Sequence, residues 1–246
     1  MDLYEHIAGD YDEVTGAAGR QKPAEEFLAE LRRRHPYDRV LDVACGNGLH
    51  AMILARAGVS VTGADISGPM LDQARRRAAE AGLSVQWVHA PMQEIAGHVE
   101  GPFDAILCLG NSLPHLLADG LLAQTLAGLA RLLAPGGAVV LQLLNYARIL
   151  AGRERIVGVT RRDNVEYVRF YDFPGDLVRF NVLKLTWTAG RCEHDLADTL
   201  LRPYTPQEIT EACRAAGLGR VECYAGLNFA PFDERQSDTL MVVARP

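Results

Sequence analysis

Five apolar runs alternate with helical patterns over residues 1–145 of this 246-residue chain. The runs have the length and composition of buried strands, and the segments between them repeat apolar residues at three- and four-residue spacing. We expect strands at residues 39–44, 59–64, 84–89, 103–109 and 137–144, and helices at residues 49–57, 69–81 and 121–133. Because repeated strand–helix units place neighbouring strands in parallel through right-handed crossovers, this pattern predicts a parallel, doubly wound sheet.

A different pattern begins after Leu150. Between residues 155 and 191, polar residues alternate with apolar or aromatic ones, and Pro174-Gly175-Asp176 interrupts the alternation, which is typical of an antiparallel β-hairpin. Further strands are expected at residues 220–225 and 238–244, and no helix precedes the last one, so it should run antiparallel. The predicted fold class is α/β: a doubly wound, Rossmann-like seven-stranded sheet with an antiparallel last strand, plus an antiparallel β insertion.

Local signals mark the boundaries of several elements. Ser67 is placed to cap the second helix. Thr205 and Glu208 form a capping box ahead of a C-terminal helix, and Pro206 occupies the first helical position. The run Ala134-Pro135-Gly136-Gly137 predicts a stop and a turn before the fifth strand.

The composition limits the classes of function. The net charge is -6 and the hydrophobic fraction is 48%, so the chain can bury a core but lacks the basic surface of a general nucleic-acid binder. The cysteines form no C-x-x-C pair, and Cys45, Cys108 and Cys213 lie among apolar or small residues, which predicts small buried side chains in a reducing compartment. No stretch approaches the ~20 apolar residues of a membrane helix, and the acidic start does not resemble a signal peptide. We expect a soluble, cytoplasmic protein with no membrane partner, no nucleic-acid partner and no metal.

The turn after the first predicted strand is the strongest candidate for a binding site. Gly46 and Gly48 let the backbone approach a ligand closely, and the helix that follows presents free N–H groups. Asp65 ends the second strand about twenty residues further on, where a carboxylate can accept hydrogen bonds from both hydroxyls of a ribose. The spacing Gly46-x-Gly48-x-x-Ala51 therefore predicts a nucleoside site, and by itself it fits a dinucleotide as well as S-adenosylmethionine.

Three further features favour S-adenosylmethionine. Asp42 places a carboxylate inside the first strand, where a dinucleotide site keeps apolar residues; the last strand is expected to be antiparallel; and CLGNSLPHL, residues 108–116, closes the fourth strand. Together with LDVACGNG, GVSVTGADIS and LAPGGAVVLQLLNYARIL, this segment resembles the glycine and sarcosine N-methyltransferases, which belong to class I of the S-adenosylmethionine-dependent methyltransferases. The resemblance runs from about Arg20 to Leu150. It implies S-adenosyl-L-methionine as cofactor, S-adenosyl-L-homocysteine as product and a small-molecule acceptor.

The resemblance also implies a set of cofactor contacts along the turn and the strand ends. They are Arg20, Ala44, Gly46, Gly48, Asp65, Ile66, Met70, Met92, Gln93, Leu109, Gly110, Asn111 and His115. Arg20 aligns with an arginine that binds the cofactor carboxylate, and the alternative is a surface arginine. Ile66 and Met70 fit either an adenine pocket or the core. Met92 and Gln93 stand where many such enzymes place an acid for the adenine amino group, so the adenine contact falls to them.

The acceptor side is less defined. Asn111 and Tyr11 are the expected catalytic residues, because Asn111 is placed to meet both the methionine part of the cofactor and the incoming nucleophile. His115 either reaches back to the cofactor or caps a helix. The candidate acceptor residues are Tyr4, Asn145, Tyr146, Tyr171, Arg179 and Arg202. Glycine methyltransferases carry an arginine directly before the Asn-Tyr pair, and Leu144 occupies that position here, so we expect an amine or hydroxyl compound other than glycine.

The expected organisation has three parts. Residues 1–150 form an N-terminal lid segment and the cofactor-binding core, residues 151–203 an antiparallel insertion near the acceptor site, and residues 204–246 a helix and strands that complete the core sheet. The expected function is methyl transfer to N or O of a small molecule, and a homo-oligomer is compatible with it. The alternative is a scaffold or sensor of the same fold that binds the cofactor without turnover, and a dehydrogenase is a third hypothesis.

Overall fold

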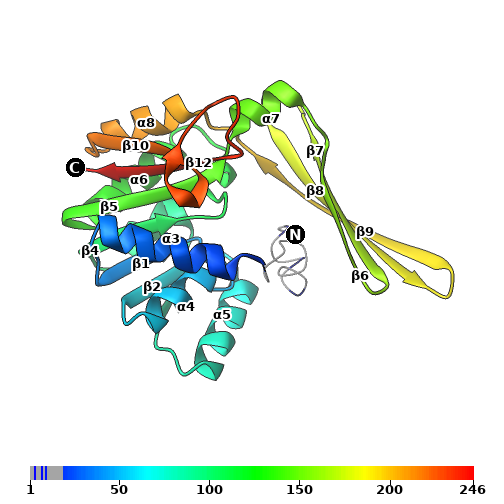
Figure 1. Ribbon diagram of the computed structural model, residues 1–246, viewed down its shortest axis with the longest axis horizontal. Coiled ribbons are helices and arrows are strands. Elements are labelled where there is room, and N and C mark those ends of the chain that lie inside the picture. Colours follow the sequence, from blue (N-terminus) through cyan, green and yellow to red (C-terminus); the bar gives the residue numbers. More distant parts are fainter. Residues whose placement is uncertain (1–2, 4–6, 8, 10–18) are drawn as a thin grey trace.

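The computed structural model describes Leu3, Ile7, Gly9 and residues 19–246. Within this part of the chain, the main sheet has eight strands in the order β11-β10-β12-β5-β4-β1-β2-β3 (Figure 1). The strands are β1 (Arg39–Val43), β2 (Ser60–Asp65), β3 (Gln86–His89), β4 (Phe103–Cys108), β5 (Leu133–Leu144), β10 (Arg220–Ala225), β11 (Ala230–Pro231) and β12 (Thr239–Arg245). Strands β1 to β5 pair in parallel, whereas β12 is antiparallel to both β5 and β10. The predicted Rossmann-like sheet and its antiparallel last strand are confirmed, and the two-residue β11 adds an eighth strand.

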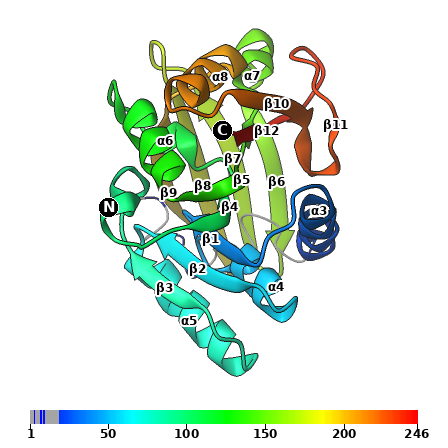
Figure 2. The same ribbon diagram turned by 90° about the vertical axis from the view of Figure 1, so that its left-hand side faces the viewer.

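Helices cover both faces of the main sheet (Figure 2). The helices are α3 (Gln21–Arg34), α4 (Leu49–Arg56), α5 (Gly68–Glu80), α6 (Leu121–Arg131), α7 (Tyr146–Gly152) and α8 (Pro206–Ala215). Successive residues of a central strand point to opposite faces, so Val40 packs in a cluster with residues of α3 and α4, while Leu41 packs in a cluster with residues of α6 and α8. This two-sided burial is why the parallel strands are apolar throughout.

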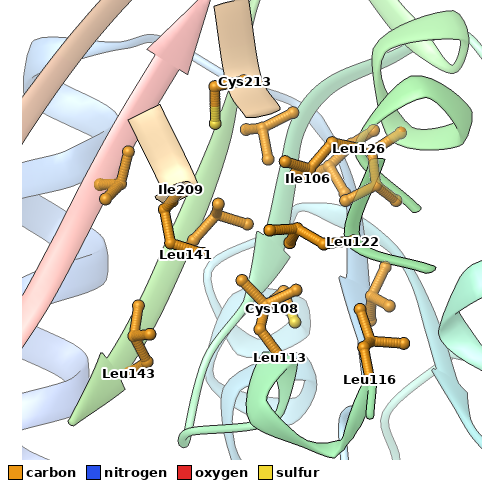
Figure 3. Packing of buried hydrophobic residues seen from close by; sticks show 14 of the residues in the cluster. Ile106, Cys108, Leu113, Leu116, Leu122, Leu126, Leu141, Leu143, Ile209 and Cys213 are labelled. Atoms are coloured by element: carbon orange, nitrogen blue, oxygen red, sulfur yellow. The ribbon is translucent and has the colours of Figure 1, made fainter. Parts of the chain in front are cut away.

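The cluster under α6 and α8 is the larger of the two. Figure 3 shows Ile106 and Cys108 of β4 beside Leu141 of β5, with Leu126 of α6 and Ile209 of α8 close by. Cys108 and Cys213 belong to this cluster and Cys45 is also buried, so the prediction of small buried cysteines is confirmed. In the part of the chain that the structure describes, no helix has the length and apolar character needed to cross a membrane.

Two of the three predicted boundary signals act as expected. The Ser67 hydroxyl accepts a hydrogen bond from the Met70 N–H and caps α5. At α8, the Thr205 hydroxyl accepts from the Glu208 N–H and the Glu208 carboxylate accepts from the Thr205 N–H, which completes the capping box.

The predicted turn at residues 134–137 is wrong. These residues lie inside β5, which starts at Leu133, and the pairing of β4 with β5 shifts its register between Phe103 and Ala105. Glycine is needed at this irregularity for two reasons: Gly136 has a φ of +80°, and a Cβ on Gly137 would lie 2.9 Å from the Asp104 carbonyl oxygen. Proline and glycine usually end a strand, but in β5 they allow the strand to continue through a bulge.

A second sheet follows α7 and is antiparallel throughout. It consists of β6 (Ile156–Arg162), β7 (Val165–Asp172), β8 (Val178–Thr188) and β9 (Arg191–Leu201), in sequence order. Figure 1 shows that it projects from the main sheet beyond α7. One face of this sheet carries Tyr167 and Val182, which pack against Leu3 and Ile7 near the N-terminus. The predicted hairpin is thus part of a four-stranded sheet.

Candidate functional site

One cavity of about 480 Å³ opens where β1, β2, β3 and β4 end at their carboxyl ends. Ligands of open α/β sheets bind at this edge, because the strand-to-helix turns converge there. Eleven of the thirteen predicted cofactor residues line the cavity: Arg20, Ala44, Gly46, Asp65, Ile66, Met70, Met92, Gln93, Leu109, Gly110 and His115. Gly48 and Asn111 are not among its lining residues.

The glycine turn has a backbone that ordinary residues adopt at a cost. Gly46 and Gly48 have φ values of +56° and +83°, and Gly48 caps the N-terminus of α4. A Cβ on Gly48 would lie 2.6 Å from the Trp87 ring, so the indole occupies the space that a side chain would need. Gly46 faces the cavity, while Gly48 shapes the turn from behind.

Asp65 is fixed at the end of β2 by two backbone donors. One carboxylate oxygen accepts a hydrogen bond from the Gly46 N–H at 2.7 Å, and the other accepts from the Ser67 N–H at 2.8 Å. The side chain is buried and lines the cavity. Two carboxylate oxygens held in fixed positions suit the paired hydroxyls of a vicinal diol such as a ribose.

Asp42 lies beneath the same turn and is buried within β1. Burial and the charge of Asp65 raise the pKa of Asp42 to about 7, against the opposing hydrogen bond from the Ala51 N–H. Its Oδ2 has no hydrogen-bond partner among the described residues. Two carboxylates under one turn make this part of the site favourable for a cationic ligand.

A positive charge lies at the start of α3. Arg20 precedes α3 and lines the cavity together with His50 of α4. Burial and the nearby Arg20 charge lower the pKa of His50 to about 4, so this imidazole is neutral at pH 7. The cavity therefore offers the Arg20 guanidinium for a carboxylate and the Asp65 carboxylate for hydroxyls, while Asp42 is buried beneath the turn. S-Adenosylmethionine carries all of these groups, and the donor set fits it.

Asn111 uses its side chain to tie β4 to β5. Its Oδ1 accepts a hydrogen bond from the Leu144 N–H at 2.9 Å, and its Nδ2 donates to the Tyr146 hydroxyl at 2.9 Å. Gln142 completes this support, because its side-chain oxygen accepts from the Gly110 N–H at 2.7 Å. Asn111 also has a φ of +68°, a strained conformation for a residue with a side chain. The structure thus places Asn111 behind the cavity wall, where it shapes the Leu109-Gly110 backbone.

The predicted acceptor residues do not converge on the cavity. Tyr146 and Tyr171 are buried in the core, and the Asn145 side chain binds the carbonyls of Glu234 and Ser237. Arg179 does not line the cavity itself, but it pairs at 3.4 Å with Asp198, which does. Arg202 pairs with Asp119 at 2.7 Å. Tyr4 and Tyr11 lie outside the described residues.

The insertion at residues 151–203 was expected near the acceptor site, but the residues that line the cavity there were not among those predicted. Asp198, Thr199 and Leu200 of β9 line the cavity, and so do Leu3, Ser112 and Leu117. The three β9 residues have no motif around them, and the packing of β9 beside η4 (Leu113–His115) brings them to the site. Ser112 belongs to the 108–116 segment that closes β4, but it was not among the predicted site residues. The Arg202 N–H, just after β9, donates to the Pro114 carbonyl and fixes this junction. In the described residues no group of three or more His, Cys, Asp or Glu side chains could hold a metal ion.

The geometry defines a nucleoside-binding α/β protein, and comparisons with known proteins narrow the class. A methyltransferase domain model matches residues 40–137. The glycine/sarcosine N-methyltransferase of Aphanothece halophytica is 34% identical over 149 residues, which are 59% of this chain and 56% of that protein. The ubiquinone biosynthesis O-methyltransferase of Psychrobacter arcticus is 30% identical over 196 residues, 77% of this chain and 70% of that protein.

Solved methyltransferase structures superpose on almost the whole of this chain. Streptomyces venezuelae DesVI has a TM-score of 0.77 at 25% identity, covering 97% of this chain and 98% of that one. An S-adenosylmethionine-dependent methyltransferase from Clostridium acetobutylicum has a TM-score of 0.83 at 17% identity, covering 99% of both chains. The chain belongs to the class I S-adenosylmethionine-dependent methyltransferases, and its cofactor is S-adenosylmethionine. The predicted family is confirmed; the match with the Aphanothece enzyme spans only 56% of that relative's length.

Proposed function

We propose that this protein transfers the methyl group of S-adenosylmethionine to a nitrogen or oxygen atom of a small molecule other than glycine. The proposal rests on one observation: a single cavity connects the expected cofactor site with the second sheet. It reaches from Asp65 and the glycine turn, which suit the cofactor, to Thr199 and Leu200 of the second sheet, which the cofactor site does not need. A neighbouring acceptor would share the same enclosed space.

Each group of residues has a part in this reaction. Bound S-adenosylmethionine supplies an activated methyl group on a sulfonium, so the protein chiefly aligns the acceptor and excludes water. Asp65 accepts hydrogen bonds from the ribose, and Arg20 binds the methionine carboxylate. The Leu109-Gly110 backbone, supported by Asn111, forms the wall beside the reacting methyl group.

The acceptor side favours a ligand with apolar surface and few polar groups. Leu3, Leu117 and Leu200 supply apolar walls, while Ser112 and Thr199 supply hydroxyls. Leu144 is half-buried and offers no cation for an amino-acid carboxylate; its N–H is used by Asn111. The relatives named above include an N-methyltransferase and an O-methyltransferase, which supports either acceptor atom.

The test has two stages. Calorimetry with S-adenosylmethionine and S-adenosylhomocysteine measures cofactor binding, and mass spectrometry then measures S-adenosylhomocysteine formed with panels of amines, phenols and carboxylates. We expect micromolar binding, product with at least one amine or phenol, and none with glycine. Absence of cofactor binding would refute the proposal. Binding without product across the panels would favour the scaffold hypothesis instead.

A further inference from the structure

The second sheet carries apolar residues on both of its faces, and within the described part of the chain only one face is seen to be covered. The face that carries Tyr167 and Val182 packs against Leu3 and Ile7. On the opposite face, which we call the outer face, four apolar residues form one row across all four strands. Cross-strand pairing places Val159 beside Val168, Val168 beside Leu183, and Leu183 beside Leu196. Cross-strand partners share a face, so this row is continuous.

The outer face is exposed to solvent. Val159 is 56% exposed and Leu196 is 53% exposed. Trp187 lies on the same face of β8 as Leu183, four residues further along, and is 42% exposed. Five of the eight large hydrophobic residues that are exposed in the described part of the chain lie in this sheet. A contiguous apolar surface of this kind is unusual on a monomer and indicates a binding surface.

The size and charge of the outer face favour a second copy of this chain. The four strands contain 7, 8, 11 and 11 residues. At the usual rise and spacing of strands, one face of such a sheet covers about 600 Å². A stable interface buries about 800 Å² on each partner. The sheet face and the side chains around its rim together expose an area close to that value.

The charges that flank the apolar row are balanced. Arg161 pairs across the strands with Glu166 on one side of the row, and Arg179 forms an ion pair with Asp198 on the other side. A surface with both signs on each side suits a copy of itself related by a two-fold axis, and it gives no net attraction to an anionic membrane or to a strongly charged partner.

We propose that the outer faces of two copies pack against each other, sheet on sheet, in a two-fold symmetric dimer. Two apolar sheet faces pack about 10 Å apart with their side chains interdigitated. The same strand links this interface to the cavity. Alternate residues of β9 share a face, so Asp198 and Leu200 lie on the outer face with Leu196, and both also line the cavity. The apolar row therefore lies next to the part of β9 that forms the cavity wall.

The experiment compares the wild-type protein with Leu196→Glu and Val159→Lys by sedimentation velocity and light scattering across the micromolar range. We expect the wild type to be a dimer, and each variant to raise the dimer dissociation constant by about 100-fold, because a charge would be buried in the apolar row. Both positions are exposed in the monomer, and the two variants add opposite charges, so a common effect reports the interface. Leu150→Glu, at an exposed position of α7, is the matched control and should leave the dimer intact.

Circular dichroism and calorimetry with S-adenosylhomocysteine show whether each variant is folded. A wild type that is monomeric throughout this range overturns the proposal, as does a folded Leu196→Glu variant with the wild-type dissociation constant. A monomer that co-sediments with phosphatidylcholine–phosphatidylglycerol vesicles also overturns it and assigns the outer face to a lipid surface. The proposal does not depend on methyl transfer, so its failure leaves the proposed function untouched.

Discussion

The main sheet and the antiparallel sheet of this protein are built from similar apolar residues, but they are buried in different ways. In the main sheet, Val40 and Leu41 point to opposite faces and both are fully buried under helices. In the antiparallel sheet, Val182 is buried while Val159 and Leu196 on the other face are exposed. The main sheet is therefore buried on both faces, whereas the antiparallel sheet has one face exposed to solvent.

This difference matches the parts that the two sheets contribute to the site. Asp65 and the glycine turn lie at the ends of strands that are packed under helices on both faces. Such rigid support suits a cofactor that makes many polar contacts. The wall formed by Thr199 and Leu200 comes from an edge strand with less support. A less constrained sheet suits the part of the site that sets acceptor choice.

The largest expected effect is a difference in stability between the two sheets. Leu107→Ala in β4 removes a fully buried side chain and should lower the free energy of unfolding by about 4 kcal/mol. Leu185→Ala in the half-buried β8 should cost about 1 kcal/mol, because less surface is lost and water can fill the space. Urea denaturation of both variants measures the difference. Equal losses would show that the antiparallel sheet is as well packed as the core.

The second effect is a pH-dependent gain from removing a buried charge in the core. The pKa of Asp42 is about 7 in the folded protein and near 3.8 when the chain is unfolded, so wild-type stability falls as pH rises from about 4 to 7. Asp42→Asn removes this dependence and should raise the free energy of unfolding at pH 8 by about 4 kcal/mol, with little change at pH 4.

Urea denaturation of wild type and variant at several pH values, without cofactor, measures this gain. His50 lowers stability as pH falls from 6.5 to about 4, but it does so in both proteins and cancels in the comparison. Asp72→Asn, at an exposed position of α5, is the control and should show no such gain. A pH-independent difference between Asp42→Asn and wild type would contradict the assignment.

The third effect concerns cofactor affinity. Asp65→Ala removes the acceptor for the ribose and for the Gly46 and Ser67 N–H groups, and should weaken S-adenosylhomocysteine binding about 100-fold, or about 2.7 kcal/mol. Calorimetry measures it, with Asp72→Ala as a matched control from the same region. Unchanged affinity in a folded Asp65→Ala protein would exclude the ribose role.

The smallest effect tests the link behind the cavity wall. Tyr146→Phe removes the hydroxyl that accepts a hydrogen bond from Asn111, and should cost about 1 kcal/mol of stability. Because Asn111 keeps its bond to the Leu144 N–H, cofactor affinity should change less than twofold. Thermal unfolding and calorimetry separate the two. A large loss of affinity would place Tyr146 closer to the ligand than its burial in the core indicates.

Sequence patterns predicted the regular parts of the fold closely. The predicted β10 has the observed bounds. Strands β1 and β4 each end one residue earlier than predicted, and β2 is shifted by one residue at both ends. The early start of β5 was missed because its proline and glycines form a bulge, and a bulge needs a partner strand to exist. The sequence indicated one hairpin where four strands form, since the exposed alternation in β9 resembles a polar surface segment.

The candidate site was likewise predicted well in some parts and poorly in others. Residues next to the glycine turn and at the ends of parallel strands were predicted to meet, and eleven of them line the cavity. Asn111 was predicted to face the ligand, yet its side chain binds the Leu144 N–H and the Tyr146 hydroxyl. A motif fixes where a residue lies along the chain, but the direction of its side chain depends on the hydrogen-bond partners that tertiary packing supplies.

The sequence by itself determined the parallel sheet, the glycine turn and the place of Asp65, because these depend on short-range periodicity and on the spacing within one strand–helix unit. Only the tertiary structure decided that β9 forms a wall of the cavity and that the row from Val159 to Leu196 stays exposed. Both outcomes depend on how the second sheet packs against segments distant in the sequence, such as η4 beside β9, and no local pattern encodes that arrangement.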